Sequence, residues 1–235
     1  MSNYTKLLKG SGSINAWGAG GSVSCGGQDG VSNVFGAALW TIDSMFDMAY
    51  RGVGIALMSG APNRLSIIQF WSISYFEDAP FTVDAAGKVI AKPTYYGMLL
   101  FASILGGSNS SVYKPETNQF DTNTRLKAWA VYNNVTQTRT YVIISKDVGP
   151  DFTVTINSPN TADGTTAQIL QVTSNSLTDP SGFTFGNIAF PGNGQGYTES
   201  QISAKGDVFT LQAKCGTATV IKVSSRSNAE PIFKF

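Results

Sequence analysis

The chain has 235 residues, of which 42% are hydrophobic and only 13% are charged, and its formal net charge is +1. This composition predicts a folded core, and the length suits one large domain or two small ones. The near-neutral, scattered charge argues against binding to nucleic acid or to an anionic membrane. The sequence has no histidine, which excludes Ser-His-Asp and Cys-His catalytic sites and argues against a zinc site. We expect no cofactor.

No targeting signal is expected in the N-terminal residues as written. They lack the apolar run and the small-residue cleavage site of a signal peptide, and no segment reaches the roughly 20 apolar residues of a membrane span. The chain as written is therefore expected to be soluble and cytoplasmic. Cys25 and Cys215 lie far apart in the sequence and match no metal or redox spacing. Two free thiols are expected because cytosolic disulfides are rare, although a bond between the two stays open.

The first part of the chain begins with a predicted loop and continues into a predicted helix. Residues 9–31 are dominated by glycine and serine, which indicates a loop. Apolar residues then recur at helical spacing over residues 35–49, and Ser32 or Asn33 can cap the start of this helix. Gly52 is expected to end it.

A short strand, an irregular stretch and a second helix follow. Residues 53–58 form an apolar run bounded by glycine, which is typical of a buried strand. Residues 66–92 have no single period. Pro93 then opens a predicted helix, which Gly106 and Gly107 end. This alternation of strands and helices is typical of an α/β unit.

From about residue 110 the periodicity changes to that of β-strands. Short alternating segments separated by polar turns favour an antiparallel β-sandwich. The expected strands cover residues 126–132, 138–145, 152–156, 169–172, 183–188, 208–211 and 217–223. The change of period predicts two domains, an α/β region over residues 1–107 and a β-sandwich over residues 108–235.

Several segments of the sequence resemble glycoside hydrolase family 79, which contains fungal β-glucuronidases and heparanase-like enzymes. The resemblance covers most of residues 18–225 and rests on Ser-Val-Ser-Cys-Gly-Gly at 22–27, Phe-Gly-Ala-Ala-Leu-Trp at 35–40 and Pro-Thr-Tyr-Tyr-Gly-Met-Leu-Leu-Phe at 93–101. The family implies a (β/α)8 barrel, with an active site at the carboxyl ends of its strands, followed by a β-sandwich. This chain is too short for both. We therefore expect a mixed α+β fold, in which a remnant of the (β/α)8 barrel, its last strand–helix units, precedes the antiparallel β-sandwich. The family leaves a secreted origin open.

The resemblance breaks at the positions that carry the family's chemistry. A retaining glycosidase needs an acid/base and a nucleophilic carboxylate about 5–5.5 Å apart. The family's acid/base glutamate lies upstream, in barrel sequence that this chain does not contain. Its nucleophile belongs to a Glu-x-Asn-Ser segment, where this chain has Ala19 and Gly21 in place of the glutamate and asparagine. The family's next strand ends in Asn-Phe-His, and here it ends in Ala56-Leu57-Met58. We expect that the chain is not an enzyme.

The other acidic residues of the first half offer a poor substitute for this pair. Asp43 and Asp47 are four residues apart on one predicted helix, where like charges usually face solvent. Glu77 and Asp78 lie in a predicted turn. A new hydrolytic pair would also need specific geometry and tuned pKa values.

Carbohydrate binding commonly uses aromatic rings against C–H groups, together with polar groups that bind hydroxyls. Trp17 lies in the glycine-rich loop, and Trp71 lies with Tyr75 in the irregular stretch; for these, ligand contact and packing both stay open. Trp40 and Trp129 fall in apolar periodic segments and are expected in the core.

The resemblance adds a loop to these candidates. It implies that Gly26 and Gly27 lie in the loop that contacts the substrate's carboxylate, whereas Tyr95 and Tyr96 match the family's helix and are expected to pack. The predicted ligand-binding residues are Trp17, Ser24, Gly26, Gly27, Trp71 and Tyr75.

The favoured function is therefore that of a non-catalytic, lectin-like carbohydrate-binding protein derived from a family 79 glycoside hydrolase. One alternative is a fragment or subunit of a glycoside hydrolase that needs a partner chain. Another is a structural or toxin-like interaction protein. Two of eight barrel strands cannot close, and an open sheet edge invites pairing, so we also expect a homo-oligomer.

Overall fold

A computed structural model describes part of the chain. It covers residues 16–20, 22–23, 26–53, 55–58, 77–84, 86–105, 110–114, 126–159, 161–189 and 199–224, with only the backbone described at 16–20 and 55–58. Contacts divide the chain into two compact units, one of residues 1–101 and 177–182 and the other of residues 102–176 and 183–235. This division describes which residues lie close together and does not show which parts fold independently. The predicted domain boundary between residues 107 and 108 therefore stays a prediction.

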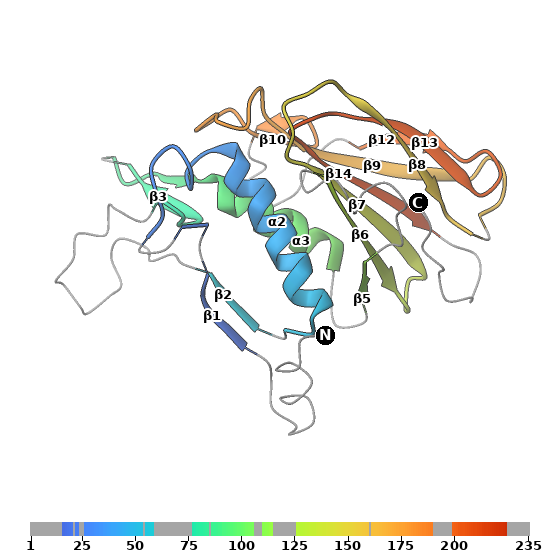
Figure 1. Ribbon diagram of the computed structural model, residues 1–235, viewed down its shortest axis with the longest axis horizontal. Coiled ribbons are helices and arrows are strands. Elements are labelled where there is room, and N and C mark those ends of the chain that lie inside the picture. The colour runs from blue at the N-terminus through green and yellow to red at the C-terminus, as the bar shows by residue number, and fades with distance from the viewer. Residues whose placement is uncertain are drawn as a thin grey trace. The chain divides into compact units, whose positions relative to one another are not determined.

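Two predicted helices are confirmed, one in the first unit and one that begins there and ends in the second (Figure 1). Helix α2 is Phe35–Tyr50, and helix α3 is Pro93–Leu105. The fully buried large side chains of α2 share one face at helical spacing, and they are Phe35, Leu39, Ile42 and Phe46. The two helices touch at Gly97, where a β-carbon would lie only 2.6 Å from the carbonyl oxygen of Ala38. A glycine is therefore needed at this helix crossing.

The predicted side-chain cap of α2 is wrong. Val34 occupies the N-cap position with extended backbone and no side-chain hydrogen bond. Ser32 and Asn33 cannot serve there because their side chains hold the preceding loop. Instead, the first two amides of the helix donate to the carbonyl oxygens of Asp179 and Leu177, both at 2.8 Å. This contact ties residues 177–182 to the first unit.

The first unit also contains a pair of parallel strands, β1 (Ala16–Gly20) and β2 (Ile55–Met58). The prediction of β2 is confirmed. The prediction of a loop over residues 9–31 is wrong for β1, whose glycine and alanine residues have little intrinsic strand preference. Pairing with β2 supplies the backbone hydrogen bonds instead, and in this register Gly20 is the partner of Met58.

A small antiparallel hairpin precedes α3. It consists of β3 (Phe81–Val83) and β4 (Val89–Ala91), with Phe81 opposite Ala91. Its residues lie in the stretch that shows no regular period, because each strand has only three residues.

The second unit is built of antiparallel strands (Figure 1). The main sheet has the order β11-β10-β9-β14-β7-β6-β5, with β12 paired to β9. Its strands are β5 (Ser110–Tyr113), β6 (Leu126–Asn133), β7 (Thr138–Ser145), β9 (Thr166–Thr173), β10 (Thr184–Phe185), β11 (Ile188–Ala189), β12 (Ser200–Ser203) and β14 (Ala218–Ser224). A separate pair joins β8 (Phe152–Asn157) to β13 (Val208–Ala213). Each predicted strand has a counterpart here, whereas β5 and β12 were missed.

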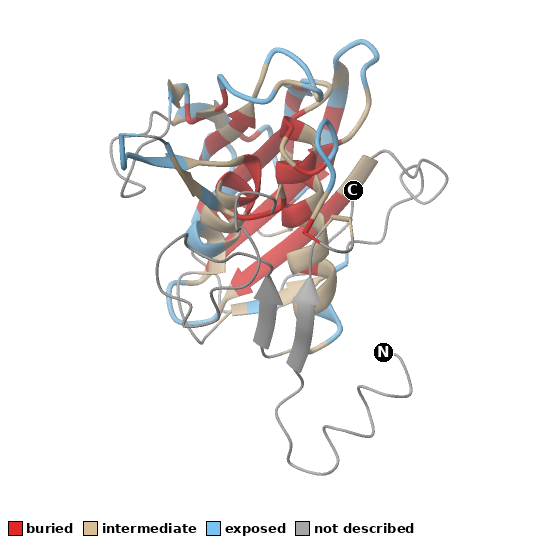
Figure 2. Cartoon of the chain, turned by 90° about the vertical axis from the view of Figure 1, so that its left-hand side faces the viewer, coloured by how far each residue is buried: buried red, intermediate tan, exposed pale blue. Residues whose placement is uncertain are grey.

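The main sheet and the β8–β13 pair share one buried apolar cluster (Figure 2). Its members include Ala130, Tyr141, Ile143, Ile221, Val154, Ile156, Phe209 and Leu211. Strands β8 and β13 alternate between buried and exposed residues, so one face of the pair covers the cluster. Strand β7 is buried at every position because it is flanked by β6 and β14 and covered on both faces.

Two expectations about single residues can be compared with this core. Trp129 is buried as expected, whereas Trp40 is only half-buried. Cys215 is a free thiol, as expected, and its Sγ donates to the carbonyl oxygen of Pro150 at 2.8 Å. Cys25 lies outside the described residues.

Candidate functional site

The carboxyl ends of β1 and β2 lie side by side in the first unit. Parallel strands followed by helices present their catalytic side chains at this edge. Here β1 has the sequence Ala-Trp-Gly-Ala-Gly and β2 has Ile-Ala-Leu-Met, so neither strand carries an ionisable side chain. Ala19 lies in β1, and Gly20 pairs with Met58. The carboxyl ends of these two adjacent strands thus carry only apolar side chains or none, and these cannot donate or accept a proton.

A buried serine, Ser32, bonds to two described residues of the segment between β1 and α2. The Ser32 hydroxyl accepts the amide N–H of Gln28 at 3.0 Å and the Ser22 hydroxyl at 2.6 Å. The Ser32 amide in turn donates to the carbonyl oxygen of Gln28 at 2.8 Å. Because Ser32 is fully buried, these bonds fix the loop against the start of α2.

Gly26 and Gly27 connect this loop to a second turn. The carbonyl oxygen of Gly26 accepts the amide N–H of Glu77 at 2.6 Å and lies 3.5 Å from the amide nitrogen of Asp78. Gly27 has a φ of +88°, and a β-carbon there would lie 2.8 Å from the Asp78 nitrogen and 2.9 Å from Cβ of Ser32. Only glycine therefore allows the loop and the turn to come this close.

Glu77 forms a partly buried ion pair across the hairpin. Lys92 Nζ donates to Glu77 Oε2 at 2.8 Å, and the Lys92 and Glu77 side chains are 15% and 27% exposed, respectively. The amide of Lys92 also donates to the carbonyl oxygen of Pro80 at 2.9 Å, which closes the β3–β4 hairpin.

Two aromatic residues lie close to this ion pair in the sequence, and one of them, Phe81, is the cross-strand partner of Ala91, which precedes Lys92. Phe81 follows Pro80 directly and is 41% exposed. Its ring centroid lies 4.6 Å from that of Tyr95, at an interplanar angle of 50°. Tyr95 in turn makes an edge contact with Tyr96, which is buried as expected. We call Glu77, Lys92, Phe81 and Tyr95 together the Glu77–Lys92 site.

The predicted site residues fall into two groups. Gly26 and Gly27 are described, and they build the backbone support of the Glu77–Lys92 site. Trp17 lies in β1, but its side chain is outside the described part of the chain. Ser24, Trp71 and Tyr75 lie outside the described residues.

Glu77, Lys92 and Phe81 were missed as site residues. The turn at Glu77 was recognised, but its carboxylate is not left to solvent, and Asp78 is buried. The available signal was an acid just before the hairpin and a base just after it, each followed within four residues by an aromatic side chain. A hairpin brings such flanking positions together.

Two further searches of the described residues concern metals and membranes. No group of three or more histidine, cysteine, aspartate or glutamate side chains in these residues is placed to hold a metal ion. Within the same part of the chain, no helix is both long enough and apolar enough to cross a bilayer.

Comparison with known proteins identifies the fold. No protein-family model matches the chain, and no curated protein matches it. Among solved structures, a 4-O-α-L-rhamnosyl-β-D-glucuronidase from Fusarium oxysporum 12S is similar with a TM-score of 0.68 at 16% identity, covering 94% of this chain and 47% of the enzyme. A GH30 endoxylanase from Clostridium papyrosolvens C71 gives 0.56 at 13%, covering 93% and 44%. An α-L-arabinofuranosidase from Thermotoga maritima gives 0.57 at 11%, covering 89% and 42%.

The chain therefore has a glycoside hydrolase-like fold, with two helices among the described residues and mostly antiparallel strands. It spans less than half the length of each of these enzymes.

Proposed function

We propose that the chain is a non-catalytic carbohydrate-binding protein derived from a family 79 glycoside hydrolase, with a barrel remnant and a β-sandwich. The order β1, α2, β2, α3 with parallel β1 and β2 supports a remnant of two strand–helix units. The buried cluster shared by the main sheet and the β8–β13 pair supports the sandwich.

The non-catalytic part of the proposal rests on the residues of β1 and β2, none of which has a side chain that can act as an acid or a base. A nucleophilic carboxylate must lie at the end of a barrel strand and about 5–5.5 Å from the acid/base group. Ala19 and Met58 stand where such polar groups would be needed. The nearby Glu77 carboxylate is engaged by Lys92, and this arrangement is suited to binding hydroxyl groups.

The Glu77–Lys92 site supplies the two chemical features that bind sugars. The half-exposed ring of Phe81, backed by Tyr95, offers an apolar surface to sugar C–H groups. The Glu77 carboxylate can accept hydrogen bonds from sugar hydroxyls. The solved neighbours are named for glucuronide, xylan and arabinofuranoside substrates, and glycans of these three classes are the ligands we propose to test first.

Multivalent display follows if the open barrel edge pairs with a second copy. A two-stranded parallel sheet such as β1–β2 leaves backbone N–H and C=O groups at its edges. We propose a homo-oligomer that covers these edges, and light scattering coupled to size-exclusion chromatography measures its mass. A monomer at all concentrations would contradict this part.

A glycan array tests the binding site directly. The wild-type chain should bind at least one glycan class, and Glu77→Gln should weaken that binding because the amide loses the charge that holds Lys92. Glu199→Gln is the matched control, since Glu199 is the only other glutamate among the described residues and lies in the second unit. No binding by the wild type, or equal losses in both variants, would contradict the proposed site.

A second candidate function is favoured by length alone. Because the chain spans less than half of its solved neighbours, a partner chain could supply further barrel strands. Such a subunit would gain glycosidase activity when a co-purified chain is added. Ala19 opposes this function, because the partner cannot supply a carboxylate at that position of β1.

A further inference from the structure

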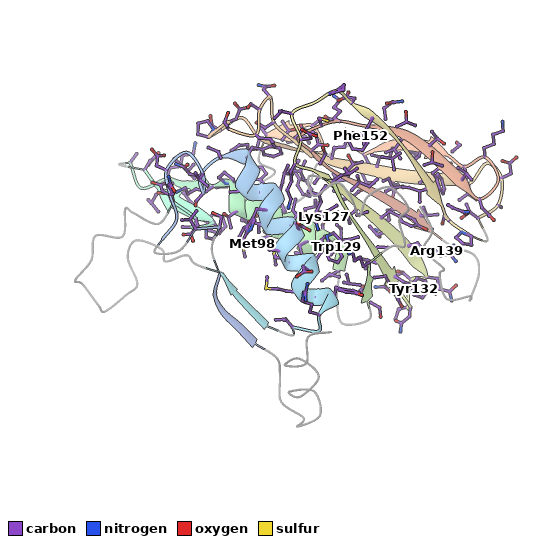
Figure 3. All side chains as sticks on the ribbon, viewed as in Figure 1. Met98, Lys127, Trp129, Tyr132, Arg139 and Phe152 are labelled. Carbon is purple, nitrogen blue, oxygen red and sulfur yellow. The ribbon has the colours of Figure 1, made fainter. Side chains whose placement is uncertain are left out.

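A charged side chain lies inside the second unit, beside its apolar cluster. Arg139 lies on β7, and its cross-strand neighbour on β6 is Tyr132 (Figure 3). Arg139 is fully buried, and its cross-strand neighbour on β14 is Val223. Its Nη1 donates to the carbonyl oxygen of Pro159. Nε and Nη2 are buried and have no hydrogen-bond partner, and no ion pair with Arg139 is found among the described residues.

This arrangement is costly unless an anion is close. A buried guanidinium that lacks a carboxylate loses its hydration without compensation. The chain does pair an arginine elsewhere: the exposed Arg51 donates from Nε to Asp47 Oδ2 at 2.6 Å. The buried arginine therefore has less charge compensation than the exposed one.

The turn next to Arg139 adds further donors. Ser158 is fully buried, and the hydroxyl of Thr161 is buried with no partner. The turn itself is fixed by Asp207, whose carbonyl oxygen accepts the Ser158 amide at 2.7 Å and whose Oδ1 accepts the Thr161 amide at 2.8 Å. Asp207 is exposed, so its charge is directed to the backbone and to solvent.

The neighbouring tyrosine does not neutralise the guanidinium. Burial raises the pKa of the Tyr141 hydroxyl, and the charge of Arg139 only partly opposes this. Tyr141 therefore keeps its proton at neutral pH and acts as one more neutral hydroxyl. The polar groups around Arg139 are hydroxyls and backbone groups, and none of those described carries a compensating negative charge.

We propose that Arg139 binds a small monovalent anion of the size of chloride. The charge and the unpartnered N–H groups of Arg139 select an anion. The full burial of Arg139 selects a small one, because a sugar or a peptide cannot enter a closed core. The anion is taken up on folding. It stabilises the second unit and plays no part in glycan binding at the Glu77–Lys92 site.

Thermal unfolding at constant ionic strength tests the site. The wild-type chain, purified without halide, is titrated with sodium chloride replacing sodium isethionate, whose anion is too large for the core. Because an anion that binds only the folded state stabilises it, Tm should rise saturably, by roughly 5–10 °C at 100 times the Kd. Arg139→Met should abolish the rise, and Arg51→Met, an exposed arginine, should keep it. No chloride-specific rise in the wild type, or the same rise in Arg139→Met, would overturn the proposal.

Two further measurements keep the proposal testable if Arg139→Met does not fold. Bromide has a similar size, so crystals of the wild type grown with sodium bromide should show an anomalous peak beside Arg139. A map without that peak overturns the proposal. Sodium formate is the third arm of the titration: a rise with formate and none with chloride would assign a carboxylate ligand and overturn the halide assignment.

Discussion

Replacing Gly27 with alanine tests whether the close approach of the loop and the Glu77 turn is real. Gly27 has a φ of +88°, and an alanine there costs about 1–2 kcal/mol for the left-handed backbone. Loss of glycine freedom in the unfolded chain returns about 0.4–1 kcal/mol. The new β-carbon would also lie 2.8 Å from the Asp78 nitrogen and 2.9 Å from Cβ of Ser32. Neither atom is the end of a flexible side chain, so overpacking should add about 1–3 kcal/mol.

Gly30→Ala is the matched control in the same loop. Gly30 has a φ of +74°, and nothing lies within 4 Å of the position that its β-carbon would take. The two variants therefore share the backbone term, and the difference between their free energies of unfolding isolates the overlap at about 1–3 kcal/mol. Urea denaturation followed by tryptophan fluorescence measures both. Equal free energies of unfolding for Gly27→Ala and Gly30→Ala would refute the reasoning, and so would unchanged glycan binding by Gly27→Ala.

Three further substitutions test other contacts. Gly97→Ala should destabilise the chain by about 1–3 kcal/mol, because its β-carbon would lie 2.6 Å from the Ala38 carbonyl oxygen. Helix propensity alone predicts about 1 kcal/mol of stabilisation. The sign of the change in the free energy of unfolding, measured by urea denaturation, decides between the two. Phe81→Ala should raise the Kd for glycan at least about fivefold, as measured by calorimetry. Val89, on the same hairpin, is 58% exposed, and Val89→Ala should leave the Kd unchanged. Equal effects of the two substitutions would remove Phe81 from the site. Tyr141→Phe tests the burial of the Tyr141 hydroxyl. Because the pKa of Tyr141 is raised, the folded chain keeps a proton that the unfolded chain loses. The free energy of unfolding of the wild type should therefore fall as pH rises above about 10, and that of the variant should fall less. Parallel declines in urea denaturation would contradict this.

The sequence predicts an element well where its own residues determine the structure. Residues 138–145 form β7 with the expected bounds because their β-branched and aromatic run favours a strand and suits burial on both faces. Strand β1 was missed because Ala-Trp-Gly-Ala-Gly carries no strand pattern, and its structure depends on pairing with β2. The cap of α2 was missed for a similar reason, since Leu177 and Asp179 lie more than 140 residues away in the chain.

In the candidate site, too, the sequence predicts poorly those features that depend on contacts between distant residues. Gly26 and Gly27 could be singled out only through the resemblance to family 79, and the positive φ of Gly27 and its contact with Asp78 give the physical reason for glycine there. The pairing of Glu77 with Lys92 joins positions 15 residues apart, and it depends on the hairpin between them. No periodicity in this stretch specifies that hairpin, because its strands have three residues each.

Saturation-transfer NMR on a glycan mixture tests the central claim most directly, because one spectrum series reports both binding and cleavage. The wild-type chain is incubated with rhamnosylated glucuronides, xylo-oligosaccharides and arabinofuranosides, and spectra are recorded over a day. The account predicts saturation transfer to at least one glycan and unchanged anomeric signals throughout. New reducing-end anomeric signals would contradict the non-catalytic assignment, and the absence of transfer to every glycan would contradict carbohydrate binding.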